Sequence, residues 1–194
     1  MSSIQLIAIT GGIGAGKSVV QAVLRNAGYS VYDCDSRAKQ LMTESAAIRQ
    51  ALTERFGCDI YSADATLNRQ LLSSKIFNDP AALAFVNSVV HPAVREDIAC
   101  WAKQQERMPA FVETAILKEG GMEHMMTQVW NVTAPQQVRI ERVMRRNGAS
   151  RQQVAERINN QHDYSSDSLP VHSIVNDGTT PILPQVMQLL EQFS

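Results

Sequence analysis

Short apolar runs alternate with amphipathic stretches over most of the chain, and this alternation predicts its secondary structure. Apolar runs typical of strands occupy residues 4–10, 29–32, 110–114, 128–133 and 171–175. Apolar positions at helical spacing occupy residues 19–27, 134–147, 150–160 and 182–193. Because a strand, a helix and a second strand in succession form a parallel unit, we expect an α/β fold with helices flanking a parallel sheet.

Residues 36–107 interrupt this alternation, because they contain helical patterns and no convincing strand. The predicted helices cover residues 36–43, 46–56, 68–77, 80–90 and 92–107. Pro80 and Pro92 suit the first turns of the last two helices, since proline has no N–H to donate. We therefore predict a core formed by residues 1–35 and 108–194, with a helical domain inserted at residues 36–107.

The stretch between the first strand and the first helix satisfies the phosphate-binding pattern G-x-x-x-x-G-K-[ST]. Residues 11–18 read Gly-Gly-Ile-Gly-Ala-Gly-Lys-Ser. Glycine lets the backbone turn tightly, so that its N–H groups converge on phosphate oxygens at a helix N-terminus. We expect Lys17 to reach the β- and γ-phosphates of a nucleoside triphosphate and the Ser18 hydroxyl to bind Mg²⁺. The alternative, a glycine-rich turn with a chance Lys-Ser pair, leaves the strand–loop–helix context unexplained.

Three carboxylates follow predicted strands. Asp33 and Asp35 lie beyond the second strand, and ligands of open parallel sheets bind beyond the carboxyl ends of strands. Asp33 could accept a proton from an acceptor hydroxyl or hold Mg²⁺ through water; the alternative is a solvated turn residue. Asp35 could support Asp33 in this role, or it could be a loop residue or a helix cap. Glu113, at the end of the third strand, could face a metal or be an ordinary polar strand end.

The helix predicted after Pro135 carries a stripe of arginines. Arg139, Arg142 and Arg146 fall on one narrow face at about 100° per residue. Just past a strand end, their guanidinium groups would form a lid over about residues 139–150 and offset the charge of a transferred phosphoryl group. The stripe could instead be a solvated basic face, and the net charge of −1 disfavours a nucleic-acid surface.

Composition narrows the class of protein further. The 194 residues are 44% hydrophobic and 19% charged, which is typical of a soluble globular protein. The three scattered cysteines indicate a reducing compartment rather than a disulfide framework. The sequence shows no signal-peptide pattern and no run of about 20 apolar residues that could span a bilayer. We therefore expect a cytoplasmic protein with no nucleic-acid or membrane partner.

Taken together, the motifs resemble those of the dephospho-coenzyme A kinase family across nearly the whole chain. The resemblance rests on residues 9–18, Asp33-Cys34-Asp35, Asn68-Arg69, Ile76-Phe77, His91-Pro92-x-x-Arg95, Arg142-x-x-x-Arg146-x-Gly148, Arg157-Ile158-x-x-Gln161 and Asn176-Asp177-Gly178. It implies a kinase that uses ATP and Mg²⁺ to phosphorylate the ribose 3′-hydroxyl of dephospho-CoA, in the last step of coenzyme A biosynthesis. It also implies a P-loop parallel sheet with a helical acceptor-binding domain and a lid.

The resemblance also implies roles for the matching positions. Asp33 looks like the general base and a metal contact beside Ser18, and Lys17 and Arg142 complete the implied catalytic set. The implied ATP-binding residues are Gly12, Ile13, Gly14, Ala15, Gly16, Lys17, Ser18, Val19, Arg142, Arg146, Asn176 and Gly178. The implied acceptor-binding residues are Asp33, Asp35, Lys39, His91 and Arg95.

The chain departs from the family pattern at several positions. Alanine, isoleucine and arginine are usual where it has Cys34, Arg37 and Lys39, and glutamine is common where it has Arg139. Residues 115–119 read Ala-Ile-Leu-Lys-Glu in place of Pro-Leu-Leu-Phe-Glu. Lysine at position 39 keeps the charge but loses the planar fork of arginine, which weakens the acceptor contact implied there.

Three other functions remain open from the residues alone. Another P-loop kinase, acting on a nucleoside, nucleotide or shikimate-like hydroxyl, would not account for the helical insertion or for the motifs at 91–95 and 176–178. A GTPase-like switch is disfavoured because the chain has no Asn-Lys-x-Asp motif. A non-catalytic nucleotide-gated module would leave Asp33 and the arginine stripe without chemistry. We expect ATP and dephospho-CoA as partners, and a monomer or small homo-oligomer.

Overall fold

The computed structural model describes residues 4–161 and 164–193 and divides the chain into two compact units. Unit 1 comprises Met1–Tyr32 and Ala102–Ser194, and unit 2 comprises Asp33–Trp101. Each unit is described by itself below, beginning with the one that contains the phosphate-binding motif.

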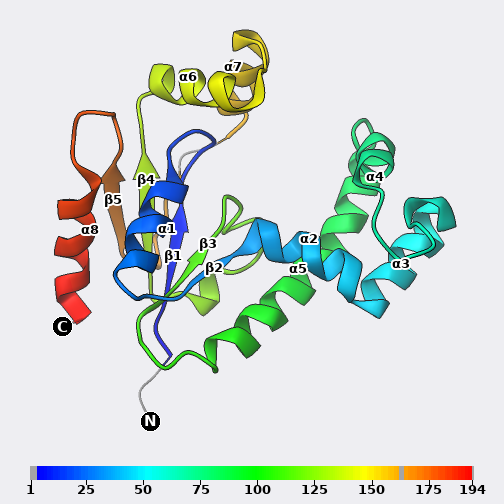
Figure 1. Cartoon of the computed structure of the whole chain (residues 1–194), viewed down its shortest axis with the longest axis horizontal. Coiled ribbons are helices and arrows are strands. Elements are labelled where there is room, and N and C mark those ends of the chain that lie inside the picture. The colour runs from blue at the N-terminus through cyan, green and yellow to red at the C-terminus, as the bar shows by residue number, and fades with distance from the viewer. Residues whose placement is uncertain (1–3, 162–163, 194) are drawn as a thin grey trace. The chain divides into compact units, whose positions relative to one another are not determined.

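Unit 1 is built on a five-stranded sheet with the strand order β2-β3-β1-β4-β5 (Figure 1). The strands are β1 (Leu6–Thr10), β2 (Val31–Asp33), β3 (Ala110–Glu113), β4 (Gln128–Thr133) and β5 (Val171–Val175). β1 pairs in parallel with β3 and β4, and β4 pairs in parallel with β5. The parallel α/β fold predicted from the sequence is therefore confirmed.

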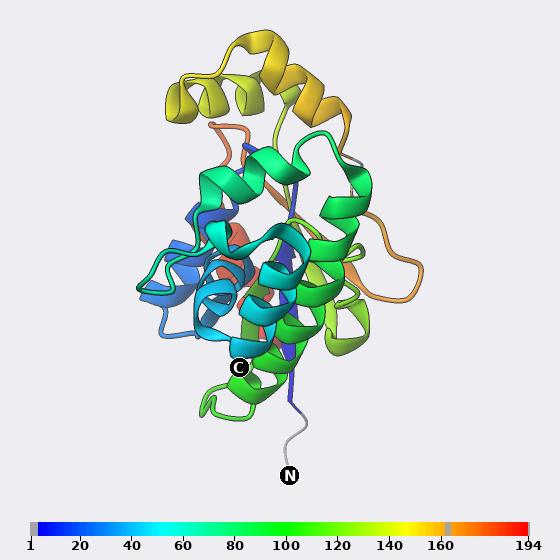
Figure 2. The same cartoon turned by 90° about the vertical axis from the view of Figure 1, so that its right-hand side faces the viewer.

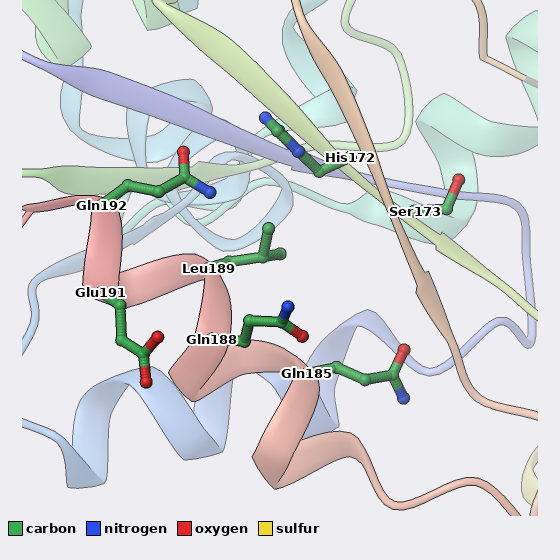
Figure 3. Close-up of a pocket in the computed structure, with 7 residues that line it drawn as sticks. All are labelled: His172, Ser173, Gln185, Gln188, Leu189, Glu191 and Gln192. Atoms are coloured by element: carbon green, nitrogen blue, oxygen red, sulfur yellow. The ribbon is translucent and has the colours of Figure 1, made fainter.

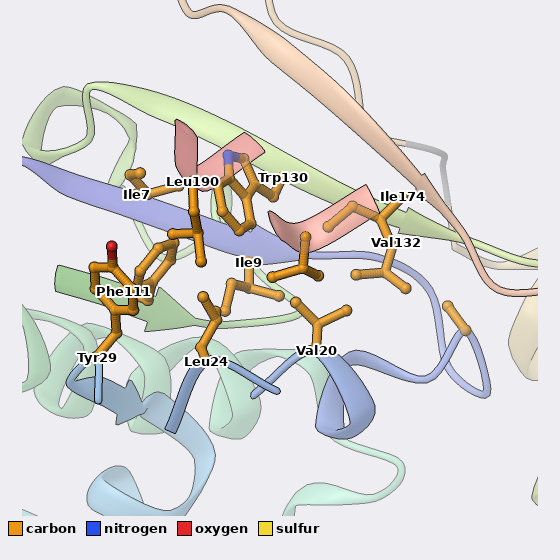
Figure 4. Close-up of a cluster of buried hydrophobic side chains, with 12 residues drawn as sticks. Ile7, Ile9, Val20, Leu24, Tyr29, Phe111, Trp130, Val132, Ile174 and Leu190 are labelled. Carbon is orange, nitrogen blue, oxygen red and sulfur yellow. The ribbon is translucent and has the colours of Figure 1, made fainter. Parts of the chain in front are cut away.

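The helices of unit 1 are α1 (Lys17–Asn26), α6 (Gln136–Asn147), α7 (Arg151–Asn159) and α8 (Ile182–Leu190). The apolar faces of α1 and α8 pack against the sheet, whereas those of α6 and α7 pack against each other in a separate cluster. Figure 1 shows α1 and α8 side by side over the sheet. Figure 4 shows Val20 and Leu24 of α1 meeting Ile9, Trp130 and Leu190 in one buried cluster. Removing this apolar surface from water stabilises the layers by about 25 cal/mol per Å².

Unit 2 is helical, as predicted, with one isolated bridge between Tyr61 and Leu67 among the residues described. Its helices are α2 (Cys34–Glu44), α3 (Ala46–Phe56), α4 (Arg69–Ile76) and α5 (Pro80–Ala102). The prediction of two helices separated before Pro92 is wrong, because α5, the long green helix of Figure 2, continues through that proline. The buried residues that hold it recur every fourth position across Pro92: Ala82, Val86, Val90, Val94, Ile98 and Ala102.

β5 is an outer strand of the sheet. The backbone N–H and C=O groups of its last residue, Val175, are hydrogen-bonded to a side chain. The Gln185 amide accepts a hydrogen bond from Val175 N at 2.8 Å and donates to Val175 O at 2.9 Å. Gln185 also lines a cavity of about 670 Å³ between β5 and α8, together with His172, Gln188 and Gln192 (Figure 3). This cavity contains none of the predicted site residues, and it lies apart from the phosphate-binding motif.

Candidate active site

The loop between β1 and α1 has the backbone geometry that its glycines allow. Gly11, Gly14 and Gly16 have φ values of +143°, +79° and +97°, which residues with a side chain rarely adopt. A Cβ on Gly11 would lie 2.2 Å from the carbonyl oxygen of Val132 on β4, so glycine is also required for close backbone approach. The P-loop therefore follows β1 and leads into the N-terminus of α1, as the motif predicts.

The side chain of Lys17, the first residue of α1, is hydrogen-bonded to this loop. Its Nζ donates to the Gly11 carbonyl at 2.9 Å and lies 3.7 Å from Oε1 of Glu113, at the end of β3. The two side chains are only 15% and 10% exposed, so their attraction is less screened than that of surface charges. Lys17 is thus fixed at the mouth of the P-loop, where an entering phosphate could replace the Gly11 carbonyl as its partner.

Arg139 and Gln161 form hydrogen bonds with the backbone C=O and N–H groups of Ile13. Arg139 Nε donates to the Ile13 carbonyl at 2.9 Å, and the Ile13 N–H donates to Oε1 of Gln161 at 2.7 Å. Arg139 also donates to the same Gln161 oxygen at 3.3 Å. These contacts attach α6 and the segment that follows α7 to the P-loop at Ile13. The sequence reasoning gave Gln161 no role, although it ends one of the quoted motifs.

Arg142 and Asn176 form a second connection to the P-loop. Arg142 donates to the backbone and side-chain oxygens of Asn176 at 2.9 and 3.0 Å. The Asn176 amide donates to the Ala15 carbonyl at 2.8 Å, and this residue is only 7% exposed. Two arginines of the predicted stripe therefore contact the P-loop region, whereas Arg146 lies one turn further along α6 and is exposed.

A cavity of about 360 Å³ opens beside these contacts, between the P-loop, the end of β4 and the two helices that follow. Its polar lining includes Asn131, Thr133, Gln136, Arg139 and Gln161. Asn131 and Thr133 were not singled out from the sequence. The signal that could have found them is their position at the carboxyl end of β4, where open parallel sheets bind ligands.

Asp33 ends β2 and caps α2. One carboxylate oxygen accepts from Ser36 N at 2.9 Å, and the other accepts from the Ser36 hydroxyl at 3.0 Å. This is the hydrogen bonding of a helix N-cap, and Asp35 follows in the first turn of the helix. A carboxylate has about four acceptor sites, so the cap leaves Asp33 able to accept further hydrogen bonds.

The other predicted acceptor residues also lie in unit 2. Lys39 is exposed on α2. His91 and Arg95 are half-buried on α5, four residues apart, so the helix places them on the same face. The residues predicted to bind the acceptor therefore lie on two helices, α2 and α5.

The oxygen atoms predicted to bind metal suit Mg²⁺, which prefers hard oxygen ligands. Over residues 4–161 and 164–193, no three His, Cys, Asp or Glu side chains gather as a metal site. Mg²⁺ commonly takes one or two carboxylates together with substrate phosphates.

Across the same part of the chain, no helix combines the length and apolar character needed to cross a membrane.

Comparison with known proteins identifies the family of the chain. The model of the dephospho-CoA kinase family matches residues 5–181. A protein of Porphyromonas gingivalis described as dephospho-CoA kinase is 38% identical, over 95% of this chain and 92% of its own. A solved protein of Thermus thermophilus has a TM-score of 0.83 and 30% identity, with both chains fully covered.

The fold alone is shared more widely. Shikimate kinase from Acinetobacter baumannii, solved with shikimate, has a TM-score of 0.55 at 13% identity, over 99% of this chain and 94% of its own. That likeness shows a common fold and does not identify the acceptor. The family match covers the P-loop, the arginine stripe and all of the helical unit, and on this basis the chain belongs to the dephospho-CoA kinase family.

Proposed function

We propose that the protein is a dephospho-CoA kinase, which transfers the γ-phosphoryl group of ATP to the ribose 3′-hydroxyl of dephospho-CoA. The hydroxyl oxygen forms a bond to phosphorus, the bond from the γ-phosphorus to the bridging oxygen of ADP breaks, and the hydroxyl proton leaves. The observation that carries the proposal is the intact P-loop, with Lys17 at its mouth, in a chain that matches this family over residues 5–181.

The P-loop would bind the triphosphate of ATP. Backbone N–H groups at a helix N-terminus and the Lys17 ammonium are suited to phosphate oxygens, which are negatively charged. The proposed ATP-binding residues are Gly12, Ile13, Gly14, Ala15, Gly16, Lys17, Ser18 and Val19 in this loop, with Arg142, Arg146, Asn176 and Gly178. The contacts from Arg142 to Asn176 and from Asn176 to Ala15 support this grouping, because they join three of its segments.

Asp33 would orient the 3′-hydroxyl and accept its proton. Its place at the end of β2 and its remaining acceptor sites support this role. The acceptor would be held by Asp35, Lys39, His91 and Arg95 in unit 2, which is proposed as the acceptor-binding domain. Closure of a lid over residues 139–150 would exclude water, which would otherwise compete as the phosphoryl acceptor.

Ser18 and Asp33 are the proposed Mg²⁺ contacts. When bound, Mg²⁺ would neutralise phosphate charge as the γ-phosphoryl group is transferred. We further propose a cytoplasmic location, supported by three cysteines that form no disulfide, and a monomer or small homo-oligomer.

The test is an assay of ADP release from ATP and Mg²⁺, with dephospho-CoA, adenosine or shikimate as the acceptor. We expect rapid release with dephospho-CoA, little with the other two, and none above background for Lys17→Ala. Preference for adenosine or shikimate would identify another P-loop kinase. Nucleotide binding without acceptor-dependent release would instead indicate a switch or a binding module.

A further inference from the structure

Arg37, on α2, has no part in the proposed chemistry. Its Nε donates to Asp97 Oδ2 at 2.8 Å, and its Nη2 donates to Asp97 Oδ1 at 2.9 Å. Asp97 lies on α5, so this two-bond ion pair connects two helices through residues that are 60 positions apart in sequence. Hydrogen bonding to Asp97 is the main reason why the pKa of Arg37 is raised, and the charge is therefore retained.

The remaining donors of Arg37 are mostly occupied as well. Its Nη1 donates to Gln40 at 3.2 Å and to Glu44 at 2.8 Å, both on α2. Nε therefore donates once, Nη1 twice and Nη2 once, so four of the five guanidinium N–H groups are engaged. A guanidinium occupied in this way is suited to holding structure rather than to binding a substrate phosphate.

Cys34 is the one fully buried residue among the eleven of α2, while Ala38, Leu41 and Met42 are half-buried. Polar contacts therefore add to the packing that fixes the position of this helix, and the Arg37–Asp97 pair is well placed to do so. The side chains are 31% and 22% exposed, and charge-assisted bonds in a two-bond fork are stronger than single contacts between fully exposed ions.

The two connected helices carry the proposed acceptor contacts. α2 is capped by Asp33, one turn before Arg37, while α5 carries His91 and Arg95. We propose that Arg37 is a positioning residue, which through Asp97 fixes α2 to α5 and orders the dephospho-CoA site before the acceptor binds. The inference rests on the proposed function. Ordering in advance favours affinity, because the helices need not be immobilised when the acceptor arrives.

The test is steady-state kinetics of the full chain, with ATP and dephospho-CoA each varied, together with a thermal unfolding measurement. The variants are Arg37→Met, Asp97→Asn and the reversed pair R37D/D97R. Each single variant should raise the KM for dephospho-CoA about three- to tenfold and leave the KM for ATP within about twofold. The reversed pair should recover part of the loss, because it restores an ion pair between the same helices.

Two matched controls separate this role from a general effect of lost charge. Glu44→Gln removes another partner of Arg37, but one on the same helix, so it cannot loosen α2 from α5. Asp59→Asn removes the ion pair with Lys75 elsewhere in unit 2. Both controls should keep the wild-type KM for dephospho-CoA.

Three results would overturn the positioning role while the proposed function stands. They are an unchanged KM for dephospho-CoA in both single variants, an equal rise in the KM values for both substrates, and an equal rise in the controls. If Arg37→Met does not fold, Asp97→Asn and the reversed pair still decide the question. A wild-type enzyme that does not phosphorylate dephospho-CoA would refute the proposed function, and the positioning role with it.

Discussion

Adding a methyl group at Gly16 should test whether the P-loop depends on the buried amide of Asn176. Gly16 has φ of +97°, and a Cβ there would lie 1.9 Å from Asn176 Nδ2. The amide would have to move, and it would lose its 2.8 Å bond to Ala15 and its 3.0 Å bond from Arg142. We therefore expect Gly16→Ala to destabilise the protein by more than backbone strain alone.

The expected magnitude has two contributions. A left-handed backbone conformation costs a residue with a side chain roughly 1–2 kcal/mol. Displacing the buried Asn176 amide adds roughly 1–3 kcal/mol, because its former partners are left without a hydrogen bond. The total is about 2–5 kcal/mol, and each kcal/mol should lower the Tm of a chain of this length by roughly 2–4 °C.

Gly178 provides the control for stability. Its φ is +95°, and a Cβ there would meet no atom within 4 Å, so Gly178→Ala carries the strain without the clash. Thermal and urea unfolding of both variants at pH 7 should separate the two contributions. In an Asn176→Ala background, Gly16→Ala should cost no more than the control does. Equal losses of stability for Gly16→Ala and Gly178→Ala in the wild-type background would refute this reasoning.

Three further predictions concern the site and its surroundings. Asp33→Asn keeps a good helix cap but removes the proposed general base. The kcat should therefore fall about 10²–10⁴-fold, with the affinity for ATP little changed. A fall in kcat of less than about threefold would contradict the role of Asp33 as general base. Arg142→Ala should lower kcat by more than it raises the KM for dephospho-CoA in initial-rate assays, and the reverse pattern would indicate a substrate-binding role. Hydrogen bonds from the Thr180 and Thr179 N–H groups lower the pKa of Asp177, so its stabilisation is present above about pH 4 and lost below. The Tm difference between wild type and Asp177→Asn should therefore shrink as the pH falls below about 4, and a difference independent of pH would contradict it.

Local patterns predicted most of the fold, because short buried strands appear as apolar runs and amphipathic helices as apolar residues at helical spacing. Pro92 shows where local reasoning fails. Proline removes one helical N–H and crowds the preceding turn, which usually ends or kinks a helix. In α5 the buried positions recur every four residues on both sides of Pro92, so packing along the whole helix outweighs that local cost.

The candidate site was predictable to the extent that it is local. The P-loop motif specifies its own backbone, and helical periodicity correctly placed Arg139 and Arg142 on one face. Their partners could not be read from spacing, because the Arg139–Ile13 and Asn176–Ala15 contacts join residues 126 and 161 positions apart. Periodicity indicates that guanidinium groups face one way, whereas tertiary packing decides that they meet carbonyl oxygens in the structure described.

The amide of Gln185 has a consequence for how the molecule behaves at high concentration. The outer edge of a sheet exposes N–H and C=O groups that can template a strand from another chain, which is a common route to aggregation. By bonding both polar groups of Val175, this side chain occupies the end of β5 where such pairing could start. One glutamine thereby helps to limit the growth of the sheet beyond its fifth strand.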